Sequence, residues 1–229
     1  MWSLDIDDDG AVSDAPAEAG VQILDVEQNT EAWRLARLGI PTASAFHKAV
    51  SVGRADQPSA IRRRYMMQLL GERLTGTLAA EFDTPETERG HYDEDVAAND
   101  YAFQQNVRVE TIGFMRRGAL GASPDRVIVG KRGIVEIKSK KPELHLDVLT
   151  RGELPGEHRA QVQGALMVSG YEFCDFVSYC RGLPLFVLRI LRDEQYIGWL
   201  CGALDEFNRE LDALEREFLA TYYGGSRAA

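Results

Sequence analysis

Two carboxylates and a lysine stand at strand spacing in the segment GASPDRVIVGKRGIVEIKSK. Successive side chains of a strand alternate between its two faces, so Glu136 and Lys138 share one face. Asp125 precedes Glu136 by eleven positions, and a strand–turn–strand hairpin would bring the two together. Such a group could bind a divalent cation and hydrolyse a phosphodiester. It could equally be an exposed ion pair on a solvated hairpin, because E-x-K triplets are common.

Two flanking helices each direct a polar group towards the same sheet. One predicted helix, 85–105, places on a single stripe Glu94, Ala97, Ala98 and Tyr101. The other, starting near Glu157, repeats this spacing with Gln161, Gly164, Ala165 and Val168. A glutamate on a small, apolar face is costly unless something pairs with it. Three converging carboxylates would raise one another's pKa values, and a bound Mg²⁺ or Mn²⁺ would remove that penalty.

The elements around this group predict an α/β fold. Helices are expected in the segment PSAIRRRYMMQLLGERLTG, at 85–105, from 157 and after Asp193, and a Pro- and Gly-rich loop at 142–156. Strands are expected at 107–115, 125–130, 133–139, 173–181 and 184–191. Helices before and after a short mixed sheet indicate a sandwich in which a central mixed β-sheet is flanked by helices. The long helix after Asp193 carries one apolar stripe, which could be core or a subunit interface.

The composition excludes several classes of protein and site. No apolar run approaches the roughly 20 residues of a membrane span, and the N-terminus is acidic where a signal peptide is basic. We therefore expect a cytoplasmic protein with no membrane partner. The 3 cysteines and 4 histidines form no C-x-x-C or H-x-x-x-H pair. A thiolate zinc or iron–sulfur centre is thereby excluded, and a metal here should be a hard cation held by carboxylates.

The net charge of −10 argues against nucleic acid only superficially. The first twenty residues hold six acids and no base, and the remainder carries 30 acids and 26 bases, a net charge of −4. Residues 1–20 are therefore predicted to be a disordered acidic tail, and 21–229 a single domain. Basic residues cluster at Arg62–Arg64, at Arg116–Arg117 and around Lys138. A DNA enzyme with local basic tracks fits this distribution.

The P-D…E-x-K pattern resembles the PD-(D/E)xK nuclease superfamily, which has a restriction-endonuclease-like sandwich. Five ordered blocks resemble more closely the lambda exonuclease, or YqaJ-like, alkaline exonuclease family. They are EAWRLARLGIPTAS, RGHYDEDVA, GASPDRV, VEIKSKKP and RAQVQGALMVSG. The resemblance extends over about residues 25–220.

This resemblance implies a role for each matching residue. Asp125 and Glu136 would be metal ligands together with the backbone carbonyl of Ile137, and Glu94 would complete the acidic cluster and support a second metal. Lys138 would position or activate the attacking water, and Gln161 would orient the water or the phosphate. The implied cofactor is Mg²⁺, with Mn²⁺ as a substitute.

The W-x-x-x-R-x-G…T-A-S block implies a pocket for a terminal 5′-phosphate, formed by Arg37 and Ser44 and joined by Ser123 of S-P-D. A guanidinium suits this role because its fork of donors matches phosphate oxygens. Arg37 could instead be a surface ion-pair residue, and Trp33 of the same block a core anchor.

The function implied is a metal-dependent 5′-to-3′ double-stranded DNA exonuclease. It would release 5′-phosphomononucleotides and leave 3′ single-stranded overhangs for recombination by strand annealing. The resemblance also implies a ring-shaped homotrimer around DNA, a single-strand annealing protein as partner, and a phage or prophage origin in a bacterial host. Two alternatives stay open. One is a structure-selective or site-specific endonuclease of the same superfamily, and the other is an inactive DNA-binding assembly protein.

Overall fold

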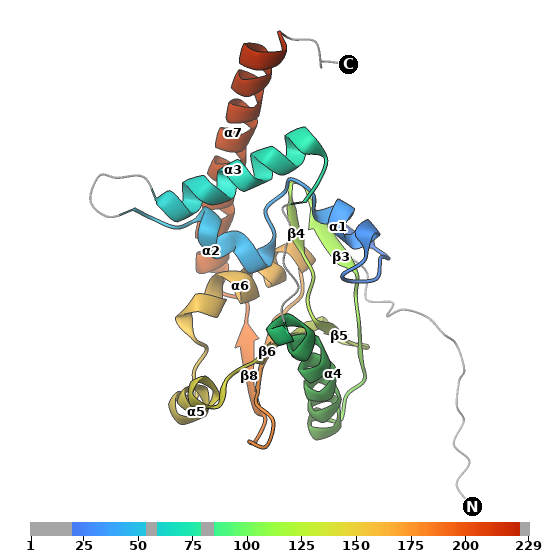
Figure 1. The fold of residues 1–229 in the computed structure, drawn as a ribbon. Coiled ribbons are helices and arrows are strands. Elements are labelled where there is room, and N and C mark those ends of the chain that lie inside the picture. Colours follow the sequence, from blue (N-terminus) through green and yellow to red (C-terminus); the bar gives the residue numbers. More distant parts are fainter. Residues whose placement is uncertain (1–19, 54–58, 79–84, 225–229) are drawn as a thin grey trace, which may run out of the picture.

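Two β-sheets lie at the centre of the computed structural model, which describes residues 20–53, 59–78 and 85–224 (Figure 1). The larger sheet has the strand order β2-β5-β6-β7-β8. Its strands are β2 (Val109–Glu110), β5 (Arg126–Ile128), β6 (Gly133–Ser139), β7 (Phe173–Tyr179) and β8 (Phe186–Leu191). Only β6 and β7 pair in parallel in this sheet, so it is mixed. Helices flank it, as the α/β sandwich predicted.

The two faces of β6 pack against different helices. Val135 and Ile137 belong to an apolar cluster with Ala97, Ala98 and Tyr101 of α4 (Pro85–Gln105). Ile134 points the other way, into the cluster that holds the apolar side chains of α6 (Arg159–Ser169). Alternation therefore turns Glu136 and Lys138 towards the α6 face, as the period-two pattern predicts.

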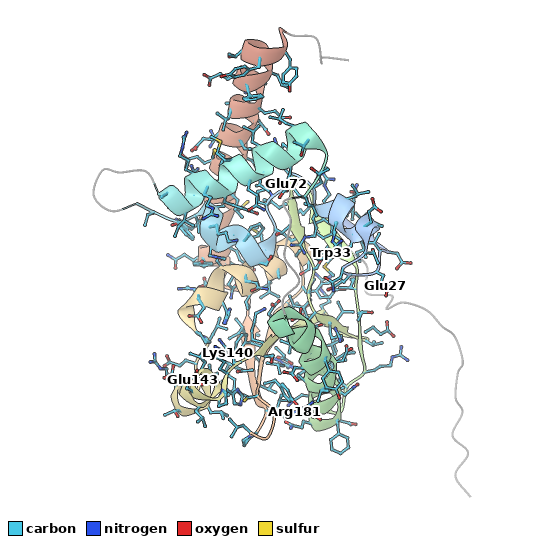
Figure 2. All side chains as sticks on the ribbon, viewed as in Figure 1. Glu27, Trp33, Glu72, Lys140, Glu143 and Arg181 are labelled. Carbon is cyan, nitrogen blue, oxygen red and sulfur yellow. The ribbon has the colours of Figure 1, made fainter. Side chains whose placement is uncertain are left out.

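The smaller sheet has the order β1-β3-β4, from β1 (Val21–Leu24), β3 (Phe114–Arg117) and β4 (Leu120–Ala122). Helix α1 (Glu31–Arg37) covers it through Trp33 (Figure 2). Trp33 belongs to an apolar cluster with Ile40 and Phe114. The chain passes from β4 in this sheet directly to β5 in the larger one. The S-P-D segment makes this crossing, which places Ser123 and Asp125 between the two sheets.

Helices α3 (Ala60–Thr75) and α7 (Glu194–Tyr223) cross above the sheets (Figure 1). Ser59 and Asp193 cap their N-termini. Ion pairs join the helices, from Arg62 to Glu210 at 2.6 Å and from Arg73 to Asp212 at 2.7 Å. The α7 stripe is core over its first part, with buried side chains at Ile197, Leu200, Leu204, Phe207 and Leu211.

A short helical segment connects α1 to α3 and lies on α6. It consists of η1 (Ala43–Ala45) and α2 (Phe46–Ala49). The approach to α6 requires Gly164, because a Cβ there would lie 2.4 Å from Cδ2 of Phe46. The T-A-S block is also joined to β4, since Gly121 donates its backbone N–H to the carbonyl of Pro41 at 3.0 Å. The loop is thus fixed between α6 and the small sheet.

Two expectations from the sequence were wrong. Residues expected in a loop form α5 (Pro142–Arg151), followed by η2 (Gly156–His158). The single strand expected at 107–115 is divided between β2 and β3, which belong to different sheets. The break includes Gly113, where a Cβ would lie 2.2 Å from the carbonyl oxygen of Val26.

The predicted acidic tail falls almost wholly on residues 1–19, which lie outside the described residues. Within the described ranges, the helices are too short or too polar to pass through a lipid bilayer.

Candidate active site

Asp125 and Glu136 lie opposite each other across the β5–β6 hairpin. Arg126 pairs with Val135 in antiparallel register. Asp125, which precedes Arg126, therefore lies opposite Glu136, which follows Val135. Asp125 Oδ2 accepts a hydrogen bond from the backbone N–H of Ile137 at 2.6 Å. Glu136 is only 2% exposed, and Asp125 is half-buried. The hairpin therefore holds one buried and one half-buried carboxylate together.

Lys138 and Gln161 both contact the Glu136 carboxylate. The Lys138 ammonium and the Gln161 side-chain amide each donate to Glu136 Oε1. Lys138 reaches it from the same face of β6, and Gln161 reaches it from the first turn of α6. The structure thus brings together the four polar groups Asp125, Glu136, Lys138 and Gln161.

These charges shift one another's protonation. Burial, and next the Asp125 carboxylate, raise the pKa of Glu136 to about 7, although Lys138 acts in the opposite direction. Burial alone would lower the pKa of Lys138, but the Glu136 and Asp125 carboxylates outweigh it and raise that pKa. Lys138 is therefore an ammonium at neutral pH, suited to donate a hydrogen bond and stabilise negative charge. The carboxylates carry more negative charge than Lys138 alone offsets.

Glu94 reaches the same region from α4 and is paired. Arg126 Nη1 donates to Glu94 Oε1 at 2.8 Å, and Arg126 Nη2 donates to Asp95 Oδ1 at 2.5 Å. The neighbouring Asp93 accepts a hydrogen bond from Ser139 Oγ, at the end of β6, at 2.9 Å. Residues 93–95 of α4 are thus bonded to side chains of both β5 and β6.

All eight side chains predicted for the site line one cavity of about 180 Å³. They are Arg37, Ser44, Glu94, Ser123, Asp125, Glu136, Lys138 and Gln161. The side chain of Ile137 faces the α4 cluster instead, in keeping with a role predicted only for its backbone carbonyl. The acidic centre and the predicted phosphate-binding groups are therefore walls of the same space.

Trp33 orients both Arg37 and Ser123. The Arg37 guanidinium lies over the Trp33 ring, 3.9 Å from its centroid. The Trp33 indole N–H donates to Ser123 Oγ at 2.8 Å, and the Ser123 hydroxyl donates to the carbonyl of Gly113 at 2.9 Å. Ser123 would have to redirect this hydroxyl to donate to a phosphate. Trp33 is largely buried, so it is a core anchor that also positions a cavity residue.

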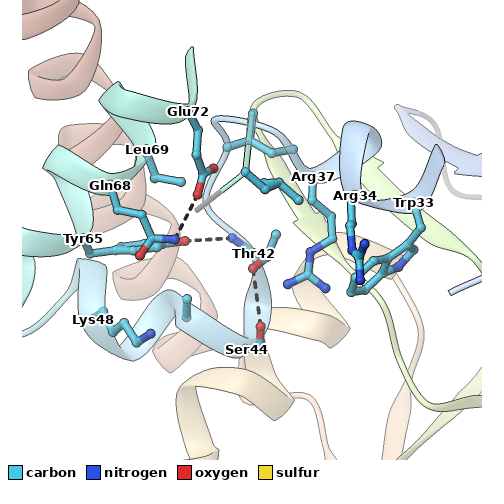
Figure 3. A pocket seen from close by; sticks show the side chains of 13 residues that line it. Trp33, Arg34, Arg37, Thr42, Ser44, Lys48, Tyr65, Gln68, Leu69 and Glu72 are labelled. Carbon is cyan, nitrogen blue, oxygen red and sulfur yellow. Dashed lines mark hydrogen bonds between the residues drawn. The ribbon is translucent and has the colours of Figure 1, made fainter. Parts of the chain in front are cut away.

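A second, larger pocket of about 530 Å³ adjoins the first and shares with it Trp33, Arg37, Thr42 and Ser44. Figure 3 shows Arg37 and Lys48 on opposite sides of this pocket, with Ser44 between them. Tyr65 of α3 accepts a hydrogen bond from the backbone N–H of Thr42 at 3.4 Å. Burial is the main cause that raises the pKa of Tyr65 to about 12, so its hydroxyl stays neutral.

Two supporting features were missed from the sequence. One is Arg126, whose signal was a charged residue within the strand expected at 125–130. The other is the contact of α3 with Gly39, which has a φ of 67°. Gly39 donates its N–H to Glu72 Oε2 at 3.1 Å and accepts from Arg73 Nε at 2.8 Å. This contact fixes the chain two residues after Arg37.

The donor chemistry fits a hard divalent cation. Carboxylates dominate the centre, and burial together with the nearby Asp125 carboxylate raises the pKa of Glu136. Among the described residues, no three Asp, Glu, His or Cys side chains are already arranged around one point. Glu136 is engaged by Lys138 and Gln161, and Glu94 by Arg126.

Comparisons with known proteins identify the family of the chain. The sequence model of the YqaJ-like viral recombinase domain matches residues 32–172, a range that includes all eight side chains predicted for the site. The chain belongs to this YqaJ-like family. None of the curated proteins compared with it gives a match.

Solved structures resemble the fold of this chain. An alkaline exonuclease (LHK-Exo) from Laribacter hongkongensis is 30% identical with a TM-score of 0.77, and the match covers 85% of this chain and 99% of that one. Its complex with dAMP matches with the same values. A phage-related exonuclease from Haemophilus somnus 129PT is 14% identical with a TM-score of 0.61, covering 78% and 96%, and agrees in fold alone.

Proposed function

We propose that this YqaJ-like protein is a DNA exonuclease that degrades one strand of a linear duplex from its 5′ end. It releases 5′-phosphomononucleotides and leaves a 3′ single-stranded overhang for recombination by strand annealing. The observation that carries this proposal is the single cavity lined by both the Asp125–Glu136–Lys138 centre and Arg37. A guanidinium that binds a terminal phosphate close to a hydrolytic centre would select DNA ends over internal positions.

The hydrolytic centre is proposed to use Mg²⁺, with Mn²⁺ as a substitute. Asp125, Glu136 and the backbone carbonyl of Ile137 would hold the ion. Bound there, it would lower the pKa of a water molecule and add positive charge beside the scissile phosphate. The buried position of Glu136 excludes bulk water from one side of the centre.

Lys138 and Gln161 orient the reacting groups. Both donate to Glu136 Oε1, so both are fixed next to the proposed ion and free rotation of their polar ends is restricted. The Lys138 ammonium stabilises the negative charge that grows on the phosphate oxygens. Gln161 offers an amide oxygen to the attacking water. Because its ammonium donates to Glu136 Oε1, we assign Lys138 to orientation and charge stabilisation rather than to proton removal.

Arg37 and Ser44 hold the terminal 5′-phosphate. Stacking on Trp33 fixes the plane of the Arg37 guanidinium, and a preorganised fork loses less entropy on binding phosphate. Ser44 is exposed at the cavity wall and can donate its hydroxyl. The Laribacter exonuclease binds dAMP, a nucleoside monophosphate, and this supports a nucleoside monophosphate as the proposed product of the present protein.

The proposed assembly is a ring-shaped homotrimer threaded by DNA, which passes the overhang to a single-strand annealing protein. A ring reconciles the net charge of −10 with DNA, because basic side chains need only face the bore. Arg63 and Arg64 of α3 are exposed and available for such a role. Arg62 is less available, since it pairs with Glu210 and lies over the Phe207 ring.

Closed circular duplex distinguishes the exonuclease from an endonuclease. With Mg²⁺ present, we expect rapid loss of the linear form and none of the covalently closed circle of the same sequence. Efficient cutting of the circle would favour the endonuclease. No release of nucleotides from either substrate, with no change on Lys138→Ala, would favour an inactive DNA-binding assembly protein.

A further inference from the structure

We infer that Arg126 provides the positive charge that a second metal ion would otherwise bring, so that this centre holds one divalent ion rather than two. The inference rests on the proposed metal-dependent function and adds the number of ions and the role of one arginine. In this arrangement Glu94 serves as the carboxylate that anchors Arg126, and it is not a metal ligand.

The contacts of Arg126 carry the first step. Its guanidinium donates from Nη1 to Glu94 at 2.8 Å and from Nη2 to Asp95 at 2.5 Å. Nη1 also donates to the backbone carbonyl of Asp125 at 2.5 Å. The Arg126 side chain is 9% exposed and that of Glu94 26% exposed. The buried Arg126 guanidinium therefore links α4 to the backbone of Asp125.

The position of Glu94 carries the second step. Glu94 lines the cavity that holds Asp125 and Glu136, and it also lines a neighbouring cavity of about 460 Å³ together with Arg126. Its carboxylate stands between the two and is bonded to the guanidinium on the Arg126 side. A second divalent ion at Glu94 would lie next to this cation, and their repulsion is strong where water is scarce.

The chemistry of arginine carries the third step. A guanidinium offers a planar fork of donors, and Arg126 uses this fork to bind Glu94 and Asp95 at the same time. Its backbone is also fixed, because Arg126 pairs with Val135 in the β5–β6 ladder. The centre is thus left with Asp125 and Glu136 as the carboxylates for one ion, while the Arg126 guanidinium stays bonded to Glu94.

Counting bound Mn²⁺ tests the inference without any activity measurement. The full chain is titrated with Mn²⁺, and bound ions are counted by isothermal titration calorimetry and by the loss of the free-ion electron paramagnetic resonance signal. We expect one ion per chain and no exchange coupling between ions. In Arg126→Gln we expect a second ion, and in the double variant with Glu94→Gln we expect one again. Arg159→Gln removes another ion pair, with Asp193 at 2.8 Å, and should keep one.

Each outcome decides a separate point. Two coupled ions in the wild type would overturn the inference and leave the proposed function intact. No bound ion at any concentration would overturn the proposed metal dependence instead. A folded Arg126→Gln variant that still binds one ion would also overturn the role of Arg126. If that variant does not fold, Arg126→Met replaces it, because methionine keeps much of the side-chain volume without the positive charge, and a second bound ion is again expected; one ion in a folded Arg126→Met would overturn the role of Arg126.

Discussion

The Asp125 carboxylate accepts a 2.6 Å hydrogen bond from the backbone N–H of Ile137, the residue that follows Glu136. One side chain thus fixes the register of the S-P-D segment against the strand that carries Glu136 and Lys138. The same bond limits the ways in which Asp125 can be replaced without disturbing the hairpin.

Asp125→Asn should abolish hydrolysis and leave the fold intact. Its amide oxygen can still accept from Ile137, while the loss of one of two opposed carboxylates relieves repulsion with Glu136. We expect activity on linear duplex to fall by more than about 100-fold. Replacing a residue that only hydrogen-bonds to a metal ligand typically costs up to about 100-fold, and Asp125 is proposed to be a ligand itself. The melting temperature should be equal or higher.

Asp125→Ala is the matched comparison. It removes the same charge and also the acceptor of the Ile137 N–H, which costs about 1 kcal/mol of unfolding free energy. A large fall in the melting temperature of the Asn variant, with hydrolysis retained, would show that Asp125 is structural.

Arg37→Ala should weaken activity selectively on 5′-phosphorylated ends. A hydrogen bond to a charged group contributes about 1.5–3 kcal/mol, which corresponds to roughly a 10- to 100-fold loss of kcat/KM. Ends with a 5′-hydroxyl should lose little. Arg34→Ala is the control, since Arg34 lines the larger pocket but not the cavity with the carboxylates. Equal losses on both kinds of end would contradict a phosphate role for Arg37.

Gly39→Ala should destabilise the fold more than Gly152→Ala. Both glycines have a φ near 67°, at 67° and 66°, a conformation that costs an L-residue roughly 1–2 kcal/mol. A Cβ at Gly39 would also lie 2.4 Å from Arg73 Cγ, whereas nothing lies within 4 Å at Gly152. Chemical denaturation measures the difference. Only Gly39→Ala should also reduce the preference for 5′-phosphorylated ends, because it displaces the segment after Arg37. Equal losses of stability would show that Arg73 moves aside freely.

His158 should make the fold sensitive to acid. Burial, followed by Lys140 and Lys138, lowers the pKa of His158 to about 4, and Lys140 Nζ lies 3.1 Å from its Nε2. The folded state therefore resists a proton that the unfolded chain accepts near pH 6.5. The stability contributed by neutral His158 is complete above pH 6.5 and is lost as the pH falls towards 4. Urea denaturation at pH 7.5 and 5 should show a smaller loss in His158→Gln. An identical loss in both proteins would assign the acid sensitivity to other groups.

Strong local periodicity made much of the scaffold predictable. The strand expected at 133–139 and the helix expected at 85–105 coincide with β6 and α4. The helix expected after Asp193 is α7, with that aspartate as its N-cap. In each case an alternating or helical stripe agrees with the tertiary packing of the same residues.

The errors arose where tertiary contacts decide. Pro142 was interpreted as a loop former, but it lies in the first turn of α5, where its missing N–H costs nothing. That helix is held by buried His145, which bonds to Ser178 at 2.8 Å and to the carbonyl of Pro184 at 2.9 Å. Neither partner is near in the sequence.

The site was predictable as a set of residue types, but its pairings were not. The stripe on α4 indicated that Glu94 points inward. Its bond to Arg126 depends on how α4 crosses β5, which no local pattern encodes. Likewise, the W-x-x-x-R spacing places Trp33 and Arg37 one turn apart, yet the bond from Trp33 to Ser123 joins residues 90 positions apart.

The most direct measurement is the digestion of one linear duplex labelled in parallel at its 5′ or its 3′ ends, with Mg²⁺ present and then removed by a chelator. A 5′-end exonuclease releases the 5′ label first, as a mononucleotide. The 3′ label stays in long strands. Without Mg²⁺, or in the Lys138→Ala variant, both labelled duplexes should remain undigested. Release of the 3′ label first, or release that persists after removal of the metal, would contradict a metal-dependent 5′-to-3′ exonuclease at this centre.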